Sequence, residues 1–260
     1  MTVGKNEIKD HITGFKEEIQ KVRKNSPKDF FGWFNTAKDK QEAFIRGSWD
    51  FAVHIALPIS RHINSPENLT LLEIGHGGGR ILAAASRFCK IAIGVDIHNE
   101  NDFVMKHLNM AGIDNIELHK TNGKSIPLKK NSVDVVYSFI VLQHVEKIEI
   151  FKNYVNESYR VLKNGGVAVL YFGREYKYSI NKSSLLLYHI DRLYENFTLR
   201  NGYREIPAKV NETNLKVSLS FAKKIVKQAG FSVLKTLVSR KKVPNGINLF
   251  GGQNGLILKK

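Results

Sequence analysis

The chain has almost no cysteine and no apolar run long enough to mark a membrane span. Cys89 is the only cysteine among 260 residues, which excludes an internal disulfide and a zinc site built from several thiolates. No apolar run approaches the ~18–20 residues that a spanning helix needs. The first residues, MTVGKNEIKD, lack the apolar stretch of a signal peptide. We therefore expect a cytoplasmic protein without a membrane span.

Acidic residues are also scarce, above all near the end of the chain. The sequence holds 40 Lys and Arg against 24 Asp and Glu, a net charge of +16, and no acidic residue follows Glu212. A basic surface attracts nucleotides, nucleic acid or acidic lipid. The alternative is that a lysine-rich surface only keeps the protein soluble. In either case, net charge bears on association with partners and not on the fold.

What the sequence does contain is a change of pattern near residue 65. Residues 6–64 carry apolar side chains at helical spacing, and Ser65-Pro66-Glu67-Asn68 then forms a turn signal. Strands alternate with helices from there on, which predicts a parallel sheet with right-handed crossovers. We expect strands over 71–74, 91–95, 116–118, 133–140, 167–172, 231–238 and 253–258.

The predicted fold class is therefore α/β, a doubly wound, mostly parallel, seven-stranded Rossmann-like sheet. We expect an N-terminal helical extension or lid over 1–65 and a main domain over 66–260. Within that domain, 173–216 breaks the alternation with tyrosines and charged residues, so we expect an inserted helical cap there.

The strongest local motif is Glu73-Ile-Gly75-His-Gly77-Gly-Gly79, between the first strand and its helix. Glycines let the backbone turn sharply and approach a ligand closely. A dinucleotide fingerprint would need glycine at position 80, where this chain has Arg80. Glu73 would repel a pyrophosphate but attract an ammonium group.

A second acidic residue, Asp96, ends the next strand in Ile93-Gly-Val-Asp96. A carboxylate about 20 residues past such glycines can accept both hydroxyls of an adenosine ribose. An aspartate at a strand end is common by itself, but together with the glycine loop it is much less so.

These motifs resemble the class I S-adenosylmethionine-dependent methyltransferases, particularly those that act on small molecules. The resemblance covers about residues 66–172 and includes Asn122–Val136, Phe139–Val145 and Tyr159–Gly166. It implies S-adenosylmethionine as the cofactor, with Glu73 near its methionine end. The cofactor-binding residues that the resemblance implies are Glu73, Gly75, Gly77, Gly79, Asp96, Ile97, Asn122, Gly123, Ser138 and Phe139.

The resemblance implies that Asp96 contacts the ribose of the cofactor and that Asn122 and Gly123 lie beside its adenine. It also implies that Ser138 and Phe139 lie under the sulfonium. Asn122 stands where the family more often has aspartate, and an amide can still bond the adenine amino group.

His144 is the candidate catalytic residue, because it follows the fourth strand and its ordinary pKa suits a base at neutral pH. The alternative is that it only bonds backbone at the start of the next helix. Gln143 is a candidate for orienting the substrate. Only Asp134 and Glu146 lie near the fourth and fifth strands, and neither is well placed to bind a cation, so we predict no metal.

Three further residues are candidates for binding the acceptor. Arg174 and Tyr176 follow the fifth strand, at the edge of the sheet where ligands bind. Trp49 belongs to an aromatic set that either lines an acceptor pocket or packs the lid.

We expect methyl transfer to an oxygen atom of an anionic small molecule, such as a sugar nucleotide or an acidic metabolite. One alternative is an RNA methyltransferase, which the charge favours, although no Asp/Asn-Pro-Pro-Tyr/Phe motif follows the fourth strand. Another is a non-catalytic binding subunit, against which the intact glycines and Asp96 argue. The sequence sets no oligomeric state.

Overall fold

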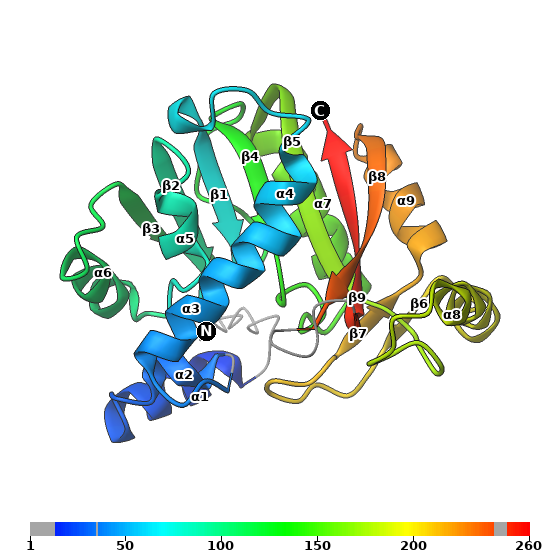
Figure 1. Cartoon of the computed structure of the whole chain (residues 1–260), viewed down its shortest axis with the longest axis horizontal. Coiled ribbons are helices and arrows are strands. Elements are labelled where there is room, and N and C mark those ends of the chain that lie inside the picture. Colours follow the sequence, from blue (N-terminus) through cyan, green and yellow to red (C-terminus); the bar gives the residue numbers. More distant parts are fainter. Residues whose placement is uncertain (1–13, 35, 242–248) are drawn as a thin grey trace, which may run out of the picture.

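The architecture is a twisted central sheet with helices on both faces (Figure 1). The computed structural model describes residues 14–34, 36–241 and 249–260. Strand β1 points downward in Figure 1, so the lower edge of the sheet holds the carboxyl ends of the parallel strands. This is the edge at which open α/β sheets bind ligands.

Seven strands form the main sheet in the order β3-β2-β1-β4-β5-β9-β8. Strand β9 runs antiparallel to both β5 and β8, and the other six strands share one direction. This confirms the predicted seven-stranded, mostly parallel sheet. The strand bounds are β1 Thr70–Ile74, β2 Ile91–Asp96, β3 Ile116–Lys120, β4 Val133–Ser138, β5 Leu162–Gly173, β8 Ser232–Arg240 and β9 Phe250–Lys259.

The segment after β5 contains a helix and a small hairpin. The helix is α8 (Leu185–Thr198), and the hairpin joins β6 (Tyr203–Glu205) to β7 (Leu215–Val217). The hairpin meets the main sheet where Lys216 pairs with Gly173 at the end of β5. The sequence predicted only helix here, because two three-residue strands give too short an alternation to detect.

Helices occupy the expected segments, with shorter bounds than the apolar spacing predicted. Residues 6–13 of the first predicted helix lie outside the described part of the chain. The bounds are α1 Phe15–Asn25, α2 Phe30–Trp33, α3 Lys40–Phe51, a π-helical turn Ala52–Ala56, α4 Leu57–Ile59, a 3-10 turn Pro66–Asn68, α5 Leu82–Ser86, α6 Asn101–Asn109, α7 Ile148–Val161 and α9 Leu219–Gln228.

Side-chain caps fix where three of these helices begin. Asp39 accepts the backbone N–H of Glu42 at the start of α3. Ser184 and Ser218 do the same for α8 and α9. Each cap satisfies one of the backbone donors that a helix start leaves open.

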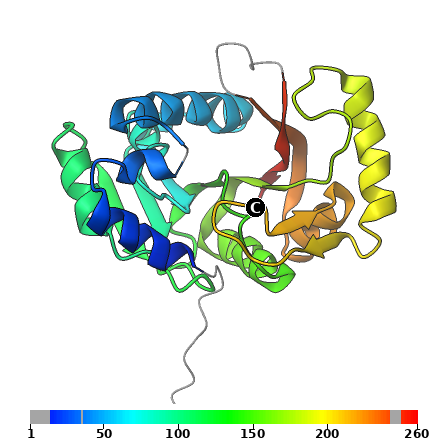
Figure 2. The same cartoon turned by 90° about the horizontal axis from the view of Figure 1, so that it is seen from below.

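The core lies in two layers, one on each face of the sheet. One layer joins the sheet to α7 and α9, and the other joins it to the N-terminal helices, α5 and α6. Figure 1 shows α3 and α4 crossing one face, with α7 behind the sheet. Viewed from below, the N-terminal helices (blue) and α8 (yellow) stand on opposite sides of the carboxyl edge (Figure 2). In the described ranges, no helix is long and apolar enough to cross a membrane.

Candidate active site

A partly enclosed pocket lies at the carboxyl ends of β1, β2 and β4. The sheet register places these ends side by side, because β1 pairs with both β2 and β4. Seven of the predicted site residues line the pocket, namely Glu73, Gly75, Gly77, Asp96, Ile97, Phe139 and His144.

The glycine loop is shaped by backbone conformations that other residues rarely adopt. Gly75, Gly77 and Gly79 have φ of 80°, 53° and 76°. A Cβ on Gly75 would lie 2.3 Å from a methyl carbon of Val141, and one on Gly77 would lie 2.8 Å from the ring of Phe34. The glycines therefore allow both the turn of the loop and the close approach of its neighbours.

Asp96 ties the end of β2 to this loop and still faces the pocket. One carboxylate oxygen accepts the N–H of Gly77 at 2.8 Å, and the other accepts the N–H of Ile97 at 2.7 Å. Burial raises the pKa of Asp96, but the nearby His98 and His76 and the two N–H donors outweigh it and lower the pKa below its ordinary value. Each oxygen keeps a free lone pair, so the ionised group can accept hydroxyl donors from a ligand.

Glu73 is a buried carboxyl group with little compensation for its burial. Among the described residues, its one side-chain hydrogen bond comes from the hydroxyl of Tyr137, at 3.2 Å. Burial raises the pKa of Glu73 to about 8, against the lowering influence of Arg80 and Tyr137. The group is therefore mostly protonated at neutral pH, and a cation in the pocket would favour its ionised form.

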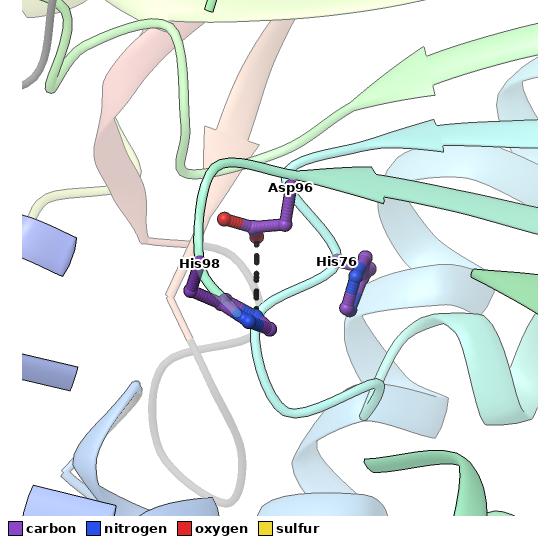
Figure 3. A group of neighbouring side chains, drawn as sticks. All are labelled: His76, Asp96 and His98. Atoms are coloured by element: carbon purple, nitrogen blue, oxygen red, sulfur yellow. Dashed lines mark ion pairs between the residues drawn. The ribbon is translucent and has the colours of Figure 1, made fainter. Parts of the chain in front are cut away.

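Two histidines surround Asp96 (Figure 3). One ligand atom from each of His76, Asp96 and His98 lies within 4.8 Å of the others, and the dashed line marks the 3.9 Å from His98 Nε2 to Asp96. Such a group could hold a metal ion only if each ring offered a lone pair. His98 Nδ1 accepts the N–H of Glu100 at 3.1 Å, so its Nε2 carries the proton and donates to the Gly77 carbonyl at 3.0 Å. Both nitrogens of His98 are thus committed, and the ring fixes the glycine loop.

His76 is neutral at physiological pH, because burial lowers its pKa to about 4. Its Nε2 lies 3.2 Å from the side-chain oxygen of Asn101 and therefore donates to it. The other nitrogen, Nδ1, is buried and has no hydrogen-bond partner in the described part of the chain. The pocket lining thus includes an unpartnered nitrogen of His76 and the sparsely hydrogen-bonded carboxyl group of Glu73.

Helix α3 anchors the loop from the other side. Arg80 forms a buried ion pair with Asp50 of α3. A Cβ on Gly47 would lie 2.1 Å from the carbonyl oxygen of Arg80, so only glycine lets the helix approach this closely. Arg80, the residue that breaks the dinucleotide fingerprint, is therefore a structural link between α3 and the pocket, which it also lines.

His144 lies at the pocket wall between two parts of the chain. Its Nδ1 lies 2.6 Å from the carbonyl oxygen of Glu212, and since a carbonyl can only accept, Nδ1 carries the proton. Its Nε2 keeps the lone pair and lies 3.3 Å from the amide nitrogen of Gln143. The ring packs against Phe15, with centroids 5.4 Å apart. Burial lowers the pKa of His144, so the ring is a neutral acceptor at physiological pH.

Four predicted cofactor residues are placed close to the pocket but not in its lining, namely Gly79, Asn122, Gly123 and Ser138. The side-chain oxygen of Asn122 accepts the backbone N–H of Lys124 and Ser125 and so closes a turn. Ser138 is buried and donates to the Ile74 carbonyl at 3.2 Å. Their roles toward the cofactor stay predictions.

The predicted acceptor residues are also absent from the pocket lining in the described chain, including Trp49, Gln143 and Tyr176. Arg174 is fully buried, where it donates to the Gly251 carbonyl and to Ser179 and pairs with Asp191. The Tyr176 ring packs under this guanidinium, 5.1 Å from its centre. Arg174 thus holds β5, β9 and α8 together and is not part of the pocket lining, so its contact with an acceptor stays a prediction.

Several pocket residues were missed because they come from distant segments. The lining also includes Phe15 and Ile19 of α1, Phe34 after α2, Tyr154 of α7 and Asn211 of the segment after β5. An aromatic run at 30–34 is visible in the sequence, but nothing local shows which ring reaches the loop.

Comparison with known proteins points to one class of enzyme. Residues 72–170 match the family model described as a methyltransferase domain. A ubiquinone biosynthesis O-methyltransferase from Brucella anthropi is 30% identical over 117 residues, which is 44% of this chain and 46% of that protein. The chain thus spans less than half the length of the curated relatives that it matches.

Solved structures show the same fold at low identity. A SAM-dependent methyltransferase from Methanosarcina mazei has a TM-score of 0.53 and 20% identity, covering 78% of this chain and 96% of that one. One from Aquifex aeolicus has a TM-score of 0.52 and 15% identity, covering 80% and 91%. The likeness thus extends well beyond the residues of the family match.

Proposed function

We propose that this chain, whose residues 72–170 match the methyltransferase-domain model, is an S-adenosylmethionine-dependent enzyme that methylates a hydroxyl oxygen of a small anionic acceptor. The observation that carries the proposal is the arrangement of Glu73, Asp96 and His144 around one pocket. S-adenosylmethionine supplies an activated methyl group when it is bound.

The residues of the pocket fit that cofactor. Asp96 has free lone pairs for a ribose diol, and Glu73 is a buried carboxyl group that an ammonium group would compensate. The ionised carboxylate of Asp96 beside the glycine loop would repel the pyrophosphate of a dinucleotide. The aromatic rings of Phe15 and Phe34 cover the pocket and would keep water from the reacting atoms.

His144 is the group that would remove the proton from an acceptor hydroxyl. Its Nδ1–H is held by the Glu212 carbonyl, which orients the ring, and an acceptor hydroxyl would replace the Gln143 amide at the Nε2 lone pair. A neutral base suits a hydroxyl, which must lose its proton as the new bond forms. The curated relatives are named as O-methyltransferases, and the net charge of +16 favours an acceptor with phosphate or carboxylate groups.

Thermal unfolding with S-adenosylmethionine or S-adenosylhomocysteine tests the cofactor site. A ligand at about 100 times its dissociation constant adds ~2.7 kcal/mol to the stability of a native state that alone binds it. We expect a clear upward shift in wild type, a much smaller one in Asp96→Asn, and a wild-type shift in Asp102→Asn, an exposed aspartate of α6. No shift in wild type would mean that the pocket does not take this cofactor.

Base catalysis is tested by His144→Gln in single-turnover assays with a panel of acidic phenols and sugar nucleotides. Removing a general base lowers the rate by roughly 10²–10⁴-fold, and the rate of the wild-type enzyme should fall only below pH 6.5, because burial lowers the pKa of His144. Amine acceptors, if they react, should be unaffected. A variant with the full rate at every pH would remove the argument for a base and for oxygen.

A further inference from the structure

Helix α8 turns its apolar side outward, the reverse of an ordinary surface helix. Leu186, Ile190, Leu193 and Phe197 follow one another at helical spacing, and three of them are at least 70% exposed. Leu185 beside them is also exposed. These five residues form what we name the α8 apolar stripe.

The opposite side of α8 is polar and buried, which fixes this orientation. Asp191 accepts three backbone N–H groups, from Lys177 to Ser179, and pairs with Arg174. Glu195 accepts the N–H of Leu219 and the side-chain amide of Asn254. Rotating α8 to bury its leucines would leave these groups unpaired in the interior, at a high cost in stability.

A basic helix lies beside the α8 apolar stripe. The hydroxyl of Ser220, at the start of α9, bonds Asn196 near the end of α8, and Figure 1 shows the two helices on the same side of the molecule. Lys224 and Lys227 of α9 are exposed. Helix α9 contains no acidic residue, and both acidic residues of α8 are buried.

Exposed basic residues also bracket α8 along the chain. Lys182 precedes the helix and Arg200 follows it. Tyr178, partly exposed, lies with its ring near that of Tyr194 and under the ammonium group of Lys177. Tyrosine and lysine at the margin of an apolar surface are typical of a protein at a membrane–water interface.

We propose that α8 and α9 together form a docking surface for a lipid bilayer with anionic head groups. The α8 apolar stripe would lie at the boundary between head groups and acyl chains, with the helix parallel to the membrane plane. The lysines of α9 would contact the anionic head groups. This surface is separate from the pocket and goes beyond the proposed function.

Charge selects this occupant over a second copy of the chain. Two copies that met through the stripe would bring basic α9 helices and net charges of +16 together, which repel. An anionic bilayer is complementary to the same surface, and it needs no matching shape.

Sedimentation with lipid vesicles tests the proposal on the full chain. We expect wild type to bind vesicles in which a third of the lipid is phosphatidylglycerol, and to bind far less to pure phosphatidylcholine. The variant Leu186→Ser/Leu193→Ser/Phe197→Ser should lose binding by at least about tenfold. The matched control, Ile45→Ser/Leu57→Ser/Met110→Ser, changes three exposed apolar residues elsewhere and should bind like wild type.

A charge variant and two controls complete the test. Lys224→Gln/Lys227→Gln should weaken binding to the anionic vesicles alone. Circular dichroism melts check that every variant is folded, and sedimentation velocity measures the mass without lipid. Wild type that ignores anionic vesicles, an α8 variant that binds as wild type does, or a wild-type dimer dissociated by the α8 substitutions would each overturn the proposal.

Discussion

Charged side chains are buried in two regions of this molecule, and the two regions treat them differently. Behind β9, in the segment after β5, Asp191 is buried with four backbone or side-chain donors and Arg174 beside it. At the glycine loop, Glu73 is equally buried, but among the described residues its side chain accepts a hydrogen bond from the Tyr137 hydroxyl alone.

The difference separates structure from function. A buried charge whose partners are all in place stabilises one arrangement of the chain, and its pKa keeps it ionised, as burial of Asp191 is outweighed by its hydrogen bonds. A buried group that lacks partners costs stability in the free protein and is retained where a ligand completes it. By this criterion Glu73 and His76 mark the binding site, and Arg174 does not.

The largest effect should come from breaking the satisfied network. Arg174→Met leaves Asp191 buried without its cation, which costs about 3–5 kcal/mol of the free energy of unfolding. We expect this loss in urea unfolding, with cofactor affinity of the folded protein unchanged. The double variant Arg174→Met/Asp191→Asn should recover part of it.

The same variant tests the sequence-based expectation that Arg174 binds the acceptor. A protein of wild-type stability with a raised KM for the acceptor would support that expectation and contradict the structural role. Only the measurement of KM requires the acceptor.

A smaller effect, on cofactor affinity, is expected from replacing His98, which lies in the other of the two regions, at the glycine loop. The ring donates to Gly77 and accepts from Glu100, so His98→Gln loses one or both of these hydrogen bonds. At roughly 0.5–1.5 kcal/mol for one bond, we expect about a two- to tenfold loss of cofactor affinity by calorimetry if one bond is lost, and up to about a hundredfold if both are. Added Zn²⁺ should leave the wild-type melting temperature unchanged, since His98 has no lone pair to offer. A melting temperature raised by Zn²⁺ in wild type but not in His98→Gln would instead establish a metal site.

The sequence predicted those parts of the molecule that depend on local pattern. Continuous apolar runs predicted the strands, and the glycines with Glu73 and Asp96 predicted the pocket end of β1 and β2. These features succeed because a strand buried on both faces and a positive φ each constrain the residue type directly.

What the sequence could not predict depends on contacts between distant segments. Arg174 follows a strand at the ligand-binding edge, yet its partners are Asp191 in α8 and the backbone of β9. Phe34, just after α2, and Tyr154 of α7 reach the pocket from segments before and after the motif. Side-chain partners of this kind are set by packing, and no spacing along the chain encodes them.

The last prediction concerns the proton that Glu73 holds. Burial raises its pKa from about 4.5 to about 8 in the folded protein, so the folded state binds more protons than the unfolded state between these values. The free energy of unfolding must therefore fall as pH rises through this window, and Glu73→Gln should flatten that dependence. If an ammonium group of the cofactor lies beside Glu73, binding at pH 7 lowers the pKa and releases nearly one proton.

Calorimetry in buffers of different ionisation enthalpy measures that proton directly. The release should vanish in Glu73→Gln and persist in Glu67→Gln, a control carboxyl group in the turn before β1. Equal proton release in both variants would place the titrating group elsewhere. The contrast between Asp191 and Glu73 would then not separate structure from function, because a buried carboxyl group with few partners and no ligand only lowers the stability of the folded protein.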